Sequence, residues 1–109
     1  MMISQLELQA FQAAPDDPNV RELERILLHA KCWLRANVIC WLTGWTDPRQ
    51  VRELAEASDC VISGQLGYKH LQHATPEEQD HFYNWMGSQA RKMWRRVQRV
   101  RRRAHQLVG

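Results

Sequence analysis

Two arginines and a glutamine lie close together at Arg49, Gln50 and Arg52, where helix-forming signals begin. Arginine can donate paired hydrogen bonds to O6 and N7 of guanine, and glutamine can pair with N6 and N7 of adenine. Glu53 and Glu56 repel phosphate, so this segment suits selective contact with bases or with a protein. We include Glu53 among the base-contact candidates. The alternative is a solvated helix face with weak Arg49–Glu53 and Arg52–Glu56 ion pairs.

A second group of polar side chains accompanies a pair of glycines. Gln65, Tyr68 and Lys69 lie next to Gly64 and Gly67, and from a hairpin they can reach a DNA phosphate or the minor groove. Lys69 is the strongest phosphate candidate of the three because it carries a positive charge. For Tyr68, covering the base of the hairpin is an equally good interpretation.

Charge is unevenly distributed along the chain. All 12 acidic residues lie at or before Asp80, whereas residues 81–109 contain eight Lys or Arg and no acid. With His neutral, the first 80 residues sum to −5, from seven basic and 12 acidic residues, and the last 29 sum to +8. This asymmetry predicts an anionic partner, nucleic acid in the first place and an acidic protein surface as the alternative. The candidate phosphate contacts are Arg91, Lys92, Arg95, Arg96, Arg99, Arg101, Arg102 and Arg103.

Signatures of catalysis and of metal binding are missing from the sequence. It contains no nucleophile elbow, P-loop, dinucleotide fingerprint or HExxH motif. His70, His73, His81 and the cysteines do not have the spacing of a zinc finger. We therefore expect neither an enzyme nor a bound metal or cofactor.

Size and composition are typical of one soluble globular domain, with 109 residues, 44% of them hydrophobic and 25% charged. No apolar stretch is long enough to cross a membrane and the N-terminus lacks a secretory signal, so we expect a cytoplasmic protein. Cys32, Cys40 and Cys60 are an odd number without CxxC spacing. This predicts reduced thiols that serve as small buried hydrophobic side chains.

Capping signals and apolar spacing predict the first helix. Asp17-Pro18 supplies an N-cap and a proline for the first helical position. The expected helix runs from about Pro18 to Ala30 and continues toward Trp33. Its buried face consists of Val20, Leu23, Ile26, Leu27 and Ala30. The earlier segment, Ile3 to Gln12, has a mixed pattern that fits a short helix or an arm.

The next two elements read as a helix pair. Ala36 to Leu42 is apolar nearly all round, which predicts a helix packed between neighbours, although its β-branched residues also permit a strand. Thr43-Gly44 favours the helix, because glycine readily adopts the left-handed conformation at a helix end. A second helix, capped by Asp47-Pro48, then extends to Ser58. Its inward face consists of Val51, Leu54 and Ala55.

A small hairpin follows. Val61 and Ile62 favour a strand, and Gly64 and Gly67 bracket a tight turn at Gln65-Leu66 that needs a glycine at positive φ. Helix, turn, helix and hairpin predict a mainly α fold, a winged helix-turn-helix over residues 18–74 with a short two-stranded β-hairpin wing. An arm or short helix over residues 1–17 precedes it, and a long C-terminal α-helix over residues 75–109 follows it.

The C-terminal helix has the strongest start signal, Thr75-Pro76-Glu77-Glu78. A coiled-coil-like apolar stripe follows at Phe82, Met86, Met93, Val97, Val100, Ala104 and Leu107. From Pro76 to Leu107 the helix would be about 48 Å long, so its distal part packs on a partner subunit or projects. We expect self-association into a homodimer through Met86, Met93, Val97 and Val100. Trp94 either stacks on bases of a single strand or lies in the core.

Several segments together resemble a group of small phage and prophage winged helix-turn-helix proteins. They are Val51-Arg52-Glu53-Leu54-Ala55, Val61-Ile62-Ser63-Gly64-Gln65, Gly67-Tyr68-Lys69 and Thr75-Pro76-Glu77-Glu78. In that group, a recognition helix ending in V-R-x-L-A leads into a wing of the type I-I-S-G-Q-x-G-Y and then a long basic helix. The resemblance covers about residues 20–105.

This resemblance implies binding of double-stranded DNA in a bacterial cell or a phage-infected host, with a role in transcription regulation or in replication. The alternative is a phage-encoded protein-interaction module, an inhibitor or adaptor of a host protein built on the same scaffold. Neither reading implies a membrane or a cofactor.

Overall fold

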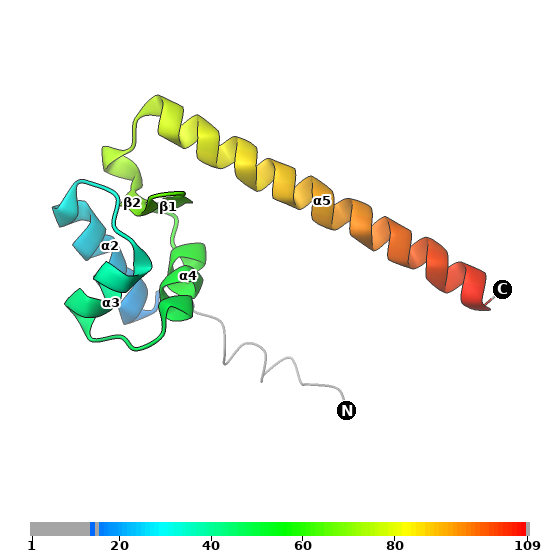
Figure 1. Cartoon of the computed structure of the whole chain (residues 1–109), viewed down its shortest axis with the longest axis horizontal. Helices are drawn as coiled ribbons and strands as arrows, with labels where there is room; N and C mark the ends of the chain where they lie inside the picture. Colours follow the sequence, from blue (N-terminus) through cyan, green and yellow to red (C-terminus); the bar gives the residue numbers. More distant parts are fainter. Residues whose placement is uncertain (1–13, 15, 109) are drawn as a thin grey trace. The chain divides into compact units, whose positions relative to one another are not determined.

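The computed structural model describes residue 14 and residues 16–108, and the chain divides into two compact units between Thr75 and Pro76. The first unit contains α2 (Pro18–Ala30), α3 (Ala36–Thr43), α4 (Pro48–Ala57), β1 (Val61–Gly64), β2 (Gly67–His70) and a 3-10 turn at Leu71–His73. The second is α5 (Pro76–Val108). This is the predicted fold, a winged helix-turn-helix with a two-stranded antiparallel hairpin and a long C-terminal helix (Figure 1).

Side-chain caps begin α2 and α4. Oδ1 of Asp17 accepts a hydrogen bond from the backbone N–H of Asn19 at 2.8 Å, and Oδ1 of Asp47 accepts one from Arg49 at 2.9 Å. Each cap precedes a proline, whose fixed φ and missing N–H suit the first turn. Between α3 and α4, Gly44 ends α3 with a left-handed φ of 81°. The predicted turn between two helices is therefore confirmed.

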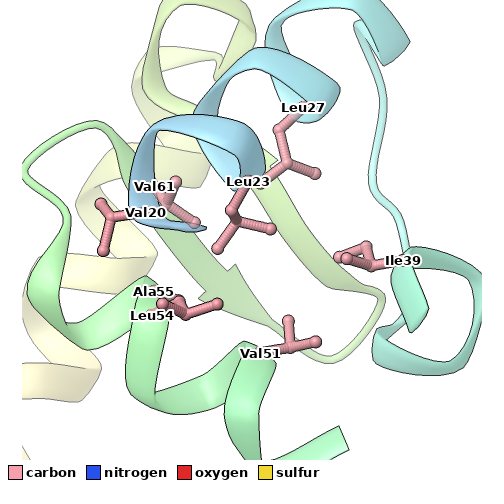
Figure 2. Close-up of a cluster of buried hydrophobic side chains, with 8 residues drawn as sticks. All are labelled: Val20, Leu23, Leu27, Ile39, Val51, Leu54, Ala55 and Val61. Atoms are coloured by element: carbon pink, nitrogen blue, oxygen red, sulfur yellow. The ribbon is translucent and has the colours of Figure 1, made fainter. Parts of the chain in front are cut away.

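The hydrophobic core of the first unit lies between α2, α4 and β1. In Figure 2 the side chains of Leu23 and Leu27 extend from α2 toward this interior, which Ile39 of α3 also reaches. The buried cluster consists of Val20, Leu23, Leu27, Ile39, Val51, Leu54, Ala55 and Val61. The predicted inward face of α4 is confirmed. Burial of each such leucine contributes about 2 kcal/mol to folding.

The segment between α2 and α3 joins the hairpin through a single residue. Leu34 forms an antiparallel bridge with Tyr68 of β2, with two backbone hydrogen bonds of 2.8 Å each. On its other side, Tyr68 faces Ser63 of β1. β2 is thus held between β1 and Leu34.

Gly67 is the residue that allows this close approach. Its φ is 118°, and a Cβ atom at this position would lie 2.2 Å from the carbonyl oxygen of Leu34. Only glycine fits both conditions. At Gly64, the other glycine of the turn, an added Cβ would meet the ring of Trp33 at 3.2 Å. The predicted turn with a glycine at positive φ is confirmed, and Gly67 is that glycine.

Two predicted features of the helices are wrong. α2 does not continue toward Trp33, because Lys31 adopts a left-handed φ of 60° and its N–H closes the helix on the carbonyl of Leu27. α3 is a helix, but it is not packed between neighbours. Only Ile39 is buried in it, whereas Trp41 is 82% exposed.

α5 is one continuous helix of 33 residues from Pro76 to Val108, so the predicted start and length are confirmed. At about 1.5 Å per residue its length is about 50 Å. It passes through Gly87 without a break, and none of its residues is buried.

The expected arm or short helix over residues 1–17 lies outside the described residues, apart from Ala14, Asp16 and the cap at Asp17. For residue 14 and residues 16–108, no helix has both the length and the apolar character that crossing a membrane requires.

We expect Gly67→Ala to lower the free energy of unfolding by about 3 kcal/mol, because it combines an unfavourable φ with a backbone clash. Gly64→Ala is the matched control in the same turn. It should stay within about 1 kcal/mol of the wild type, since only the Trp33 side chain must move. Urea unfolding of both variants measures the difference. Equal losses would contradict the assigned role of Gly67.

Candidate nucleic-acid interface

The first half of α4 presents the predicted base-contact residues to solvent. Arg49, Arg52 and Glu53 are exposed and Gln50 is half-buried. Val51 and Leu54, on the opposite side of the helix, are anchored in the core. The rigid core therefore holds the polar side of α4 outward, as reading a DNA groove would require.

Arg49 is paired with its own cap rather than with Glu53. Its Nε lies 3.3 Å from Oδ2 of Asp47 and 3.4 Å from Oδ1. The backbone N–H of Arg49, followed by its side chain, holds the pKa of Asp47 below the usual range. Both side chains remain open to solvent, at 77% and 48% exposure. Such an exposed pair is weak, so Arg49 can exchange Asp47 for another partner.

Tyr68 connects the wing to α4. It is half-buried and packs against the hydrophobic core, in agreement with the interpretation that it covers the hairpin base. Burial raises the pKa of its hydroxyl, the charge of Arg52 lowers it, and that of Glu56 raises it. The Tyr68 hydroxyl is thus within electrostatic reach of the exposed side of α4.

The remaining wing candidates differ in their surroundings. Gln65 is exposed in the hairpin turn, next to Leu66, which is 57% exposed. The ammonium of Lys69 lies 5.5 Å from the ring centroid of Trp33. This cation–π contact orients Lys69, and sequence reasoning missed it because Trp33 lies 36 positions earlier in the chain.

The predicted basic residues of the second unit are all exposed along α5. No acidic residue accompanies them after Asp80. Trp94 is 55% exposed, so the interpretation of Trp94 as a core residue is wrong, and the stacking interpretation stays a prediction. The self-association candidates are also exposed: Met86 46%, Met93 68%, Val97 40% and Val100 59%.

The base of the wing contains a titratable pair, His70 and His73, which were considered from the sequence only as metal ligands. Nδ1 of His70 accepts a hydrogen bond from the N–H of Gln72 at 3.0 Å, and the His73 ring lies 6.2 Å from the His70 ring. Nε2 of His73 donates to the carbonyl of Leu28 at 2.8 Å. Burial, followed by the neighbouring His73, lowers the pKa of His70, whereas Glu24 acts in the opposite direction.

Glu24 also ties α2 to the start of the hairpin. Its Oε2 accepts a 2.6 Å hydrogen bond from Oγ of Ser58, which in turn accepts one from the backbone N–H of Cys60 at 3.0 Å. Burial and the Glu24 carboxylate raise the pKa of the Cys60 thiol.

The cysteines are free, but the expectation that all three are buried is wrong. Cys40 and Cys60 are half-buried and Cys32 is exposed, because Cys32 lies in the link after α2 rather than on a packed face. Within the described part of the chain, no three His, Cys, Asp or Glu side chains are grouped as metal ligands.

α3 presents an apolar surface to solvent. Val38, Trp41 and Leu42 are 39%, 82% and 52% exposed. Leu42 and Leu34 also line an open hollow of about 380 Å³ along α2. The hollow is completed by Glu22, Arg25, Ile26, His29 and Ala30. The sequence had predicted that Val38, Trp41 and Leu42 lie in a helix packed between neighbours.

No protein-family model, curated protein or solved structure matches this chain.

We expect the protein to lose stability as the pH falls from the ordinary histidine value of 6.5 through the lowered pKa of His70. Below 6.5 the unfolded chain binds the proton more readily than the native chain, so protonation favours unfolding. His70→Asn should reduce this loss, because asparagine keeps an acceptor for Gln72 and does not titrate. Urea midpoints at about pH 7.5 and about pH 5 measure the effect.

The control is His81→Asn, which changes an exposed histidine of α5. It should retain the pH dependence of the wild type. If His70→Asn retained it as well, the assignment of this dependence to His70 would be wrong.

Proposed function

We propose that this chain is a phage-type winged-helix protein that binds double-stranded DNA, with a regulatory or replication-associated role in the cytoplasm of a bacterial or phage-infected cell. The observation that carries the proposal is the first half of α4, where Arg49 and Arg52 are exposed and Gln50 is half-buried, with β1 of the wing in contact with the same helix. A helix and wing arranged in this way can contact a groove and the adjacent backbone together.

The two units would contribute differently to binding. The polar side of α4 carries Arg49 and Arg52 but also Glu53 and Glu56, so it attracts phosphate weakly and suits base selection. The eight exposed basic residues of α5 supply the phosphate attraction. Gln65 and Lys69 on the wing are further backbone-contact candidates. Specificity is thus assigned to the first unit and most of the affinity to the second.

A selection from random duplex sequences tests the base-reading part. The wild type should enrich a preferred sequence, whereas a variant with Arg49, Gln50 and Arg52 all changed to Ala should bind weakly without preference. Each lost bidentate base contact should cost about 1–3 kcal/mol of discrimination. Retained sequence preference in this variant would remove α4 from the proposal.

Salt dependence tests the phosphate part. Changing Arg91, Arg95, Arg99 and Arg102 to Gln should weaken binding to all duplexes alike and reduce the slope of log affinity against log salt by about 0.9 per lost contact. Arg21→Gln, an exposed change in α2, is the control and should leave the slope unchanged. Absence of duplex binding at about 50 mM salt, or binding that salt does not affect, would refute the DNA-binding proposal.

The apolar surface of α3 favours a second candidate, the host-protein inhibitor or adaptor. Trp41, with 82% of its surface exposed, is the kind of aromatic anchor that dominates protein interfaces. A DNA contact gives no physical reason for this tryptophan to be exposed.

Capture from nuclease-treated bacterial lysate separates the two candidates. A protein partner should survive the nuclease, be lost with Trp41→Ser, and be retained by the triple variant of Arg49, Gln50 and Arg52. Partners that disappear with the nuclease would instead be bridged by DNA, and would count against the interaction-module candidate.

A further inference from the structure

α5 presents an apolar seam with a strict seven-residue period. Positions 83, 90, 97 and 104 are Tyr, Ala, Val and Ala, and positions 86, 93, 100 and 107 are Met, Met, Val and Leu. These two sets alternate at spacings of three and four, as the a and d positions of a coiled coil do. All eight residues are exposed in the continuous helix, over about 36 Å.

We propose that this seam binds the same seam of a second copy of the chain, with the two α5 helices antiparallel and position 90 of each opposite position 93 of the other. The interface does not depend on the DNA-binding proposal. It specifies the orientation and register of the self-association predicted from the stripe.

Side-chain volumes favour the antiparallel arrangement. In a parallel pair each a residue meets itself, which places Tyr83 against Tyr83 and Ala90 against Ala90. In the antiparallel register large residues meet smaller ones, namely Tyr83 with Val100, Met86 with Val97, and Ala90 with Met93. Layers of more even volume leave fewer voids and less overpacking.

Charges on the flanks of the seam favour the same arrangement. A parallel pair would place Arg96 next to Arg101 of the other copy, twice. In the antiparallel register the flank positions e face e, which brings Asp80 next to Arg101 of the other copy at two symmetric sites. Positions g face g, which places Arg96 beside Gln89. No like-charged pair is then formed on the flanks. Sliding the helices by one heptad, to oppose Met93 and Val97, would set Arg96 against itself.

Gly87 provides an independent observation. Glycine within a helix costs about 1 kcal/mol relative to alanine, and the single chain gives no reason for it. The φ of Gly87 is not positive, and an added Cβ would meet only the Arg91 guanidinium at 3.5 Å. In the proposed register Gly87 faces Trp94 of the second copy, where a missing side chain makes room for the indole ring.

The pairing leaves most of the positive charge available. Five of the eight basic residues lie at the outward b, c and f positions of the heptad, namely Arg91, Lys92, Arg95, Arg99 and Arg102. The apolar seam and the outward basic surface are therefore separate sides of one helix, and the helix pair can form with or without an anion bound.

Thiol cross-linking tests the orientation and register. The full chain, with Cys32→Ser, Cys40→Ala and Cys60→Ala checked by circular dichroism, receives either Met86→Cys or Val97→Cys. A short bismaleimide should link the two variants to each other when mixed, and should link neither efficiently to itself. Self-linking of the Val97→Cys variant would show a parallel pair. Preferential linking of Met93→Cys to Val97→Cys would show the other register. Either result overturns the proposal.

Charge reversal tests the flank pair in the otherwise unchanged chain. Asp80→Arg and Arg101→Asp should each weaken dimerisation about tenfold in sedimentation, since each creates two like-charged contacts. Combining both changes should restore it to near the wild-type value. Arg95→Asp, at an outward position, is the control and should not weaken it. Failure of the double variant to recover, or a wild type that remains monomeric at tens of micromolar, would refute the proposal, whatever the DNA-binding result.

Discussion

The backbone contact between Leu34 and the start of β2 is the constraint on which the first unit depends. A hairpin of two four-residue strands is marginal by itself in water. The bridge between Leu34 and Tyr68 gives β2 a second neighbour, and the absent side chain of Gly67 permits it. With β2 fixed, Tyr68 packs on the core, and its hydroxyl lies within the electrostatic influence of Arg52 of α4. One glycine therefore couples the direction of the wing to the helix that carries the base-contact candidates.

Local sequence signals made α4 and α5 predictable, whereas contacts between residues far apart in the chain could not be predicted. The cap at Asp47, the start signal Thr75-Pro76 and the period of the apolar residues specify these helices within the segments themselves. The Leu34 bridge has no such signal, because one paired residue produces no alternation of polar and apolar positions. The predicted bounds of α2, Pro18 to Ala30, are confirmed, but its expected continuation toward Trp33 was wrong for a similar reason, since the residue in the left-handed conformation, Lys31, is not glycine.

The side-chain contacts of the candidate site were likewise only partly predictable from the sequence. Residue type predicted correctly that Arg49, Arg52 and Glu53 lie on the surface, but not that Arg49 pairs with the cap residue Asp47. That pairing follows from the extended backbone of the cap, which brings the carboxylate to the first turn of the helix. For α3, a segment apolar on all sides fits a core helix and a binding surface equally well, and only the fold exposes Trp41.

The geometry of a helix explains why α5 combines a large exposed apolar surface with a high positive charge. α5 buries none of its own residues, so it has no hydrophobic core of its own that would stabilise it. Eight positive charges would also oppose the pairing of two α5 helices if all of them lay along the seam. Distributing five of them at outward heptad positions relieves that repulsion and turns them toward any phosphate backbone nearby. Of the three that remain beside the seam, Arg96 and Arg101 would form the flank contacts that differ between partner orientations in the proposed pair. The charge pattern of α5 therefore both limits which helix can pair with it and defines the surface left for an anionic ligand.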